Sequence, residues 1–238
     1  MANISNVGRM IQKIGEKLGG AQKTSYDASF DAQIRAAEVT KEHVEKLIEK
    51  LELVLQPDPA VRVEALCPEG TTKLEDFASL CTSMSTKLSD ATQLSVSLQH
   101  LSDGEMKLAS EDRSFIRKTE YYVLKELQRF LEEEWRALVA ERKVLEQKRL
   151  DMDAVKNAIR NARKRDDVER LEFKLKDTTA AFETQAEVVK SLLDKFPDHH
   201  EKIRLRLRDF LKAQLSYYSR GHEILTLTLK NFSAPVPT

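Results

Sequence analysis

Residues 168–224 read VERLEFKLKDTTAAFETQAEVVKSLLDKFPDHHEKIRLRLRDFLKAQLSYYSRGHEI, and an apolar residue stands at every seventh position of this stretch. Such a repeat keeps one face of an α-helix on a continuous seam, as in coiled coils. A helix of this length would span roughly 85 Å, far more than a compact domain of this size. The stretch therefore predicts an elongated coiled coil with the apolar column Val168, Leu175, Phe182, Val189, Phe196, Ile203, Phe210, Tyr217 and Ile224.

A second column with the same spacing lies upstream, in a helix predicted from Leu88 to Arg165 with Asp103-Gly104 as its candidate bend. Aspartates suit a helix N-terminus, so Asp166-Asp167 should begin the next helix and the chain should reverse there. A connection this short predicts antiparallel packing. Pro197 should kink the third helix. The second column is Leu124, Leu131, Leu138, Leu145, Met152 and Ile159.

The first long helix is predicted from Thr24 to Leu55. Pro57 and Pro59 stop it, because each proline disfavours helix in the residue before it. Residues 60–88 are expected to hold a turn at 68–70 and a short helix over 74–84.

The apolar columns need more partner surface than one chain offers. The third helix is longer than the first can cover, so a homodimer is the simplest solution. The dimer and coiled-coil seam is expected to include Leu124, Leu131, Trp135, Leu138, Leu145, Phe210 and Tyr217.

Composition narrows the class of protein. Of 238 residues, 33% are charged, and 39 basic residues balance 39 acidic ones, which argues against a bulk nucleic-acid binder. The sequence has neither the long apolar run of a transmembrane helix nor a secretory signal, and two cysteines fit a cytoplasmic protein. His199-His200 lacks further ligands at metal-site spacing, and Asp151 and Asp153 do not share a helix face. No phosphate loop or nucleophile motif occurs, so no enzyme, metal or cofactor is expected.

Residues 1–20 have the pattern of an amphipathic helix. Arg9, Lys13 and Lys17 lie opposite an apolar stripe that occupies an arc of about 120°. A stripe at this spacing is usually core or a partner-helix face, but the basic opposite face and two internal glycines favour a membrane surface. The residues expected to insert are Ile4, Val7, Met10, Ile11, Ile14 and Leu18.

A basic cluster ends the second long helix. It comprises Lys156, Arg160, Arg163, Lys164 and Arg165, with no acidic residue among them. Taken alone, the cluster is best interpreted as a solvated helix end whose positive charges complement the helix dipole.

Four stretches then point to a family: residues 16–24 (EKLGGAQKT), 55–59 (LQPDP), 141–156 (ERKVLEQKRLDMDAVK) and 213–218 (AQLSYY). In this order they resemble the N-BAR domain of the endophilins, and the endophilin B type most. The resemblance implies an all-α, crescent-shaped homodimer of kinked antiparallel three-helix coiled coils that binds anionic phospholipid membranes peripherally. It also implies sensing or generating curvature in endocytosis and membrane trafficking, with the N-terminal stripe inserted and the basic residues on lipid phosphates. The expected organisation is a membrane-binding segment (1–20), a BAR domain (21–232) and the start of a linker or tail (233–238).

Two departures from the family matter. The sequence stops at Thr238 without the Src-homology-3 domain typical of the endophilins, so proline-rich partners are expected only if such a domain exists. Residues 60–76 are shorter than the insert that contacts the membrane at the apex of the family's crescent, so no such contact is assigned to them.

Two alternative functions stay open at this stage. The coiled coil could be a scaffold that binds partner helices without touching lipid, or it could be an effector of a small GTPase. Vesicle co-sedimentation separates the first from a membrane module, and a pull-down with a nucleotide-locked GTPase tests the second.

Overall fold

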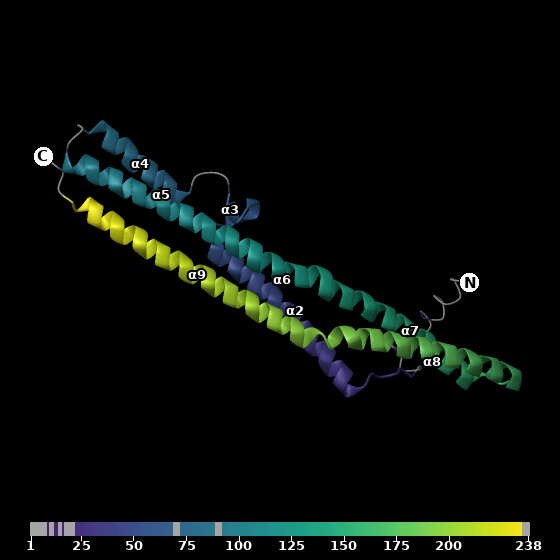
Figure 1. The fold of residues 1–238 in the computed structure, drawn as a ribbon. Helices are drawn as coiled ribbons and strands as arrows, with labels where there is room; N and C mark the ends of the chain where they lie inside the picture. The colour runs from purple at the N-terminus through teal and green to yellow at the C-terminus, as the bar shows by residue number, and fades with distance from the viewer. Residues whose placement is uncertain are drawn as a thin grey trace. The chain divides into compact units, whose positions relative to one another are not determined.

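The computed structural model describes Arg9, Gln12, Lys13, Glu16 and residues 22–68, 72–88 and 92–234. Every regular element in these ranges is helical, which confirms the predicted all-α class (Figure 1). The chain divides into two compact units, which are described separately below. The first comprises Met1–Val44 and Arg129–His200, and the second comprises Glu45–Gln128 and Glu201–Thr238.

Helix α2 spans Ala28–Leu55 and starts later than the predicted Thr24. Two contacts explain the difference. The side chain of Asp27 accepts a hydrogen bond from the backbone N–H of Ser29 at 3.0 Å, as an N-cap does. The backbone N–H of Thr24 is bound instead by Asp153 of a distant helix, at 2.9 Å. The predicted end at Leu55 is confirmed, and α3 (Pro59–Glu64) begins directly after its N-cap Asp58.

The second long helix is continuous from Gln93 to Asn161. It does not break at Asp103-Gly104, so the candidate bend is not a helix boundary. A Cβ added to Gly104 would lie 2.6 Å from Cγ2 of Thr228, so this glycine allows a close approach of α9 (Phe196–Phe232). The run comprises α5 (Gln93–Thr119), the π-helix η1 (Glu120–Leu124), α6 (Lys125–Arg129), the π-helix η2 (Phe130–Trp135) and α7 (Arg136–Asn161).

In the first unit, α7 and α8 (Arg165–Leu193) lie side by side and antiparallel (Figure 1). The chain reverses over residues 162–164, and Asp166 and Asp167 occupy the first turn of α8, as predicted. Apolar residues of α2, α7, α8 and the start of α9 form the core. They are Ile34, Ala37, Val44, Leu138, Leu145, Leu150, Met152, Val155, Val189, Leu193 and Phe196.

Pro197 interrupts the third long helix where the sequence indicated. Helix α8 ends at Leu193 and α9 spans Phe196–Phe232, with Pro197 in its first turn. A proline ring clashes with the carbonyl of the residue four positions earlier, which here is Leu193. The helix therefore stops and restarts.

The second unit contains α4 (Lys73–Lys87), which matches the short helix predicted over 74–84 and packs along α5 (Figure 1). Small side chains line this contact, and the hydroxyl of Ser85 donates to the carbonyl of Ser95 at 2.8 Å. Because α4 turns its small residues inward, its large apolar residues stay at the surface. These are Phe77, Leu80 and Met84.

Candidate functional site

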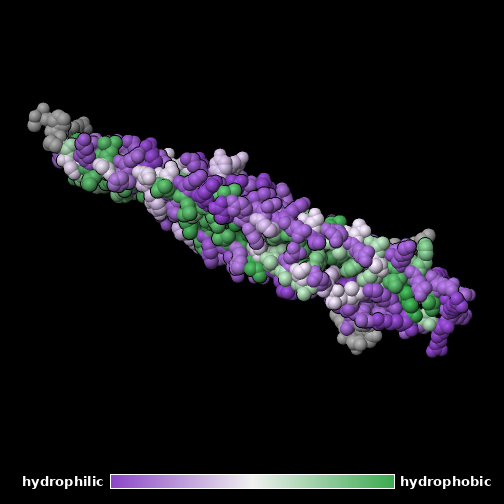
Figure 2. Space-filling model, turned by 60° about the horizontal axis from the view of Figure 1, so that its bottom comes forward, coloured by the Kyte–Doolittle hydropathy of each residue, from purple (hydrophilic) through white to green (hydrophobic). Residues whose placement is uncertain are grey.

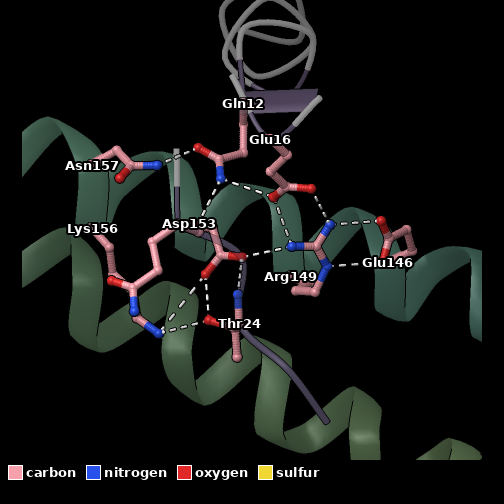
Figure 3. Close-up of polar contacts among 9 residues, drawn as sticks. Gln12, Glu16, Thr24, Glu146, Arg149, Asp153, Lys156 and Asn157 are labelled. Carbon is pink, nitrogen blue, oxygen red and sulfur yellow. Dashed lines mark hydrogen bonds and ion pairs between the residues drawn. The ribbon is translucent and has the colours of Figure 1, made fainter. Parts of the chain in front are cut away.

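The most strongly connected polar site is centred on Arg149 of α7, which the sequence did not single out (Figure 3). Its side chain is 1% exposed. Its Nε and Nη2 donate to Glu146 at 2.9 and 2.8 Å, and Nη1 and Nη2 donate to Glu16 at 2.8 and 3.0 Å. Nη1 also donates to Asp153 at 2.7 Å. All five N–H donors of the guanidinium are therefore engaged.

Asp153 joins the site to the segment before α2. It is 1% exposed, and its carboxylate accepts both the backbone N–H of Thr24 at 2.9 Å and the hydroxyl of Thr24 at 2.5 Å. Lys156 donates to the same hydroxyl at 3.1 Å and lies 3.9 Å from the Asp153 carboxylate. A buried carboxylate is tolerated only when it is paired and hydrogen-bonded, and Asp153 meets both conditions.

Described residues of the N-terminal segment bind the same helix. Arg9 forms a two-bond ion pair with Asp151, at 2.8 and 2.7 Å. Asn157 donates to the side-chain oxygen of Gln12 at 2.6 Å, and Gln12 is buried. With the Glu16–Arg149 pair, three positions of the segment contact α7, an arrangement here called the α7 clasp.

Electrostatics favour the charged form of the clasp at neutral pH. Hydrogen bonds from Arg149 lower the pKa of Glu16 and of Glu146, against the opposing effect of burial. A carboxylate whose folded-state pKa is lowered contributes stability above its unfolded pKa, and this is lost as pH falls through the folded value. The clasp is thus at full strength near pH 7 and weakens only in acid.

The N-terminal site residues divide into two groups. The structure places Arg9 on Asp151 and leaves Lys13 exposed. The predicted inserting residues Ile4, Val7, Met10, Ile11, Ile14 and Leu18, together with Lys17, lie outside the described residues.

The predicted basic cluster is only partly a free surface. Lys156 donates to the hydroxyl of Thr24, and Arg160 donates to the side-chain oxygen of Gln22. The remaining three are exposed at the reversal between α7 and α8: Arg163, Lys164 and Arg165. Arg165 also contacts Glu169 at 3.2 Å, but an exposed pair of this kind contributes only about 0–1 kcal/mol. These three residues are called the tip below.

Most of the predicted seam is internal to one chain. Leu124, Leu138 and Leu145 are buried within the single chain. The rings of Phe210 and Tyr217 pack against Phe115 of α5, with centroids 6.1 and 5.2 Å from that of Phe115. These five therefore belong to the coiled-coil part of the prediction, and not to a surface free for a partner. Leu131 and Trp135 are half-buried, and their place at a dimer interface stays a prediction.

A second apolar row on α9 was missed. It is displaced by one residue from the internal column and repeats at alternating steps of four and three, which is the heptad pattern. Leu215 is 69% exposed and Leu229 is 67% exposed. In Figure 2, hydrophobic side chains reach the surface in patches between hydrophilic ones. The row, called the outer row below, is Leu211, Leu215, Tyr218, Leu225, Leu229 and Phe232, with His222 at the seventh position.

The structure also places the histidines and cysteines considered above. No group of three potential metal ligands occurs there. His199 is buried against the rings of Phe130 and Phe196, with Glu134 at 3.9 Å. Cys67 and Cys81 are free thiols.

No helix among the residues described is long and apolar enough to cross a bilayer.

Comparison with known proteins identifies the class. A family model described as "BAR domain" matches residues 4–232. The chain therefore belongs to the BAR domain family, whose members dimerise, bind membranes and act without catalysis on membrane curvature.

Relatives agree with this assignment and with the resemblance to endophilin B. The chain is 28% identical to Endophilin-B2 of Gallus gallus over 91% of its own length and 63% of that protein. It is 29% identical to Endophilin-B1 of Rattus norvegicus and of Homo sapiens, over 91% of its length and 62% of theirs. The chain thus spans less than two thirds of these relatives.

Proposed function

We propose that this chain is the membrane-binding module of an endophilin-like protein, a homodimer that binds anionic membranes peripherally and senses or generates their curvature. The observation that carries the proposal is the BAR domain match over residues 4–232. In this proposal the N-terminal stripe inserts at the headgroup boundary and the tip contacts lipid phosphates. The module serves membrane trafficking.

The outer row of α9 supports the homodimer. A heptad row of large apolar residues exposed to water is unfavourable for an isolated chain, and a second α-helix would cover it. A second copy presents the same row, which suits the self-complementary interface of a two-fold dimer. A solution scattering profile would test the dimer and the predicted crescent together.

Energetics favour two weak contacts acting together. Each large apolar side chain contributes about 1.5–3 kcal/mol when fully buried, and each cation near an anionic leaflet contributes about 1 kcal/mol. Ordering the helix offsets much of this gain, so one anchor is marginal. A dimer supplies two anchors, and the second binds at a high effective concentration.

Met10→Asp combined with Ile14→Asp tests insertion. Two carboxylates on the apolar stripe should prevent burial at the headgroup boundary, because a charge is costly to remove from water. We expect binding to anionic vesicles to weaken and tubulation to fall at least tenfold, while the dimer remains. Co-sedimentation with the vesicles and electron microscopy of them measure the two effects.

The matched control for insertion is Met10→Leu with Ile14→Leu, which keeps the stripe apolar and should tubulate as the unmodified protein does. Unchanged tubulation by the aspartate pair would show that insertion is not the mechanism.

Lys164→Glu combined with Arg165→Glu tests the tip. Each dimer loses eight units of positive charge at its tips, and we expect affinity for anionic vesicles to fall at least tenfold at low salt. The difference should shrink as salt rises, because the Debye length drops from about 30 Å at 0.01 M to about 8 Å at 0.15 M. Co-sedimentation across this range measures it.

The control for the tip makes the same charge change at Lys107 and Lys118, which are exposed on α5. If both variants lose the same affinity for vesicles, binding depends on net charge and not on the tip. Equal binding by the tip variant and the unmodified protein would show that the tip is a solvated helix end that does not contact lipid.

A further inference from the structure

The α7 clasp uses one face of the N-terminal segment. Arg9, Gln12 and Glu16 are spaced three and four residues apart, so they share one side of a helix, and the structure assigns all three to helix. Each meets a different residue of α7: Arg9 meets Asp151, Gln12 meets Asn157 and Glu16 meets Arg149. The contact is therefore built along the segment at three points.

The docked face is polar, and the sequence puts the apolar residues elsewhere. At 100° per residue, the three docked positions fall opposite the predicted apolar stripe. A helix at a membrane surface points its apolar face into the lipid and its polar face toward water. The face that α7 binds is thus the one that insertion would leave free, and docking and insertion do not compete for the same side.

We propose that the clasp holds the N-terminal segment on α7 while the segment is inserted in the bilayer. This inference rests on the proposed function. In this arrangement Asp151, Asn157 and Arg149 are positioning residues, because they contact no lipid themselves. They attach the inserted N-terminal segment to the helical body of the domain. Insertion of the segment and binding of the domain therefore bend the membrane together.

The buried contacts of Arg149 and Thr24 support a lasting attachment of the N-terminal segment to α7. Arg149 has all its donors engaged and is 1% exposed, and removing one partner of a buried pair strands a desolvated charge. Thr24 is anchored to Asp153 by its backbone and its hydroxyl, which fixes the C-terminal side of the segment to the same helix (Figure 3). Glu16 and Thr24 are thus both bound to α7.

Asp151→Ala combined with Asn157→Ala removes two clasp partners without touching the inserting segment. The variant gains one positive charge per chain, so electrostatics alone predict equal or tighter binding to anionic vesicles. The clasp predicts the same for binding, which should be within twofold of that of the unmodified protein or tighter. It predicts a separate loss of curvature generation, with tubulation at least fivefold weaker. Co-sedimentation and electron microscopy with the same anionic vesicles separate the two readouts.

A charge swap and a matched control sharpen this experiment. Arg9→Asp alone should reduce tubulation, and adding Asp151→Arg should restore it by rebuilding the pair. Asp177→Ala, which removes an exposed carboxylate from α8, should leave tubulation unchanged. Tubulation equal to that of the unmodified protein in the Asp151→Ala, Asn157→Ala variant would overturn the clasp, and stronger tubulation would identify an inhibitory latch instead.

Cross-linking decides between a clasp and a latch directly. Gln12→Cys and Asn157→Cys are introduced in a background in which both native cysteines are replaced by alanine. A short thiol-specific linker then joins the two introduced thiols. The clasp predicts that the linked dimer still tubulates anionic vesicles at no less than half the unlinked level. Loss of tubulation on linking would overturn it. Failure of the unmodified protein to bind these vesicles would instead refute the proposed function, a separate result.

Discussion

Leu138→Glu is expected to unfold the first unit rather than merely separate a dimer. Leu138 is 0% exposed within a single chain, so the substitution places a carboxylate in a core that offers it no partner. Losing the leucine and burying an unpaired charge together cost more than about 5 kcal/mol, comparable with the whole stability of many domains. Circular dichroism should show a large loss of helix at 25 °C, or a fall in Tm of more than about 15 °C.

The adjacent residue supplies the control. Val139 is 45% exposed on the same helix, so Val139→Glu should keep the helix content and lower Tm by no more than a few degrees. Native helix content and Tm in Leu138→Glu would contradict the placement of this column in the core of one chain.

Heptad spacing predicted the interior of the fold well. None of the nine apolar residues counted from Val168 to Ile224 is exposed, and Val189 is fully buried. Helix boundaries set by local chemistry were also predictable, because prolines and aspartates act within one turn. Leu55, Asp166 and Pro197 mark such boundaries.

What the sequence could not predict depends on distant partners. Thr24 looks like a helix start until Asp153, 129 residues away, takes its backbone N–H. Arg149 reads as an ordinary surface arginine, because arginine is rarely buried. Only the fold brings Glu16 to it, although the spacing of Arg149 and Asp153 at i and i+4 was a visible local signal.

The outer row was missed for a different reason. Positions 210, 217 and 224 form the internal column, and positions 211, 218 and 225 repeat with the same period one residue later. One residue turns a helix by about 100°, so the two rows face different neighbours. A single heptad count finds the first row and overlooks the second.

Leu215→Glu combined with Leu225→Glu is expected to convert the proposed dimer to a folded monomer. Both side chains are exposed in the single chain, so the charges cost the fold little. In a two-fold dimer the pair removes four leucines from the interface, each worth about 1.5–3 kcal/mol when buried. Since about 1.4 kcal/mol corresponds to a tenfold change, the dissociation constant should rise at least a thousandfold.

Analytical ultracentrifugation at low micromolar concentration measures this change. The control is Ser216→Glu with Leu227→Glu, which adds the same charges to exposed positions turned about 150° around α9 from the outer row. We expect the control to sediment as a dimer and the outer-row variant as a monomer with native helix content. Because a monomer carries one membrane anchor instead of two, the outer-row variant should also bind vesicles more weakly. A dimer that survives both leucine substitutions would show that the copies meet elsewhere, and the outer row would then need another partner to cover it.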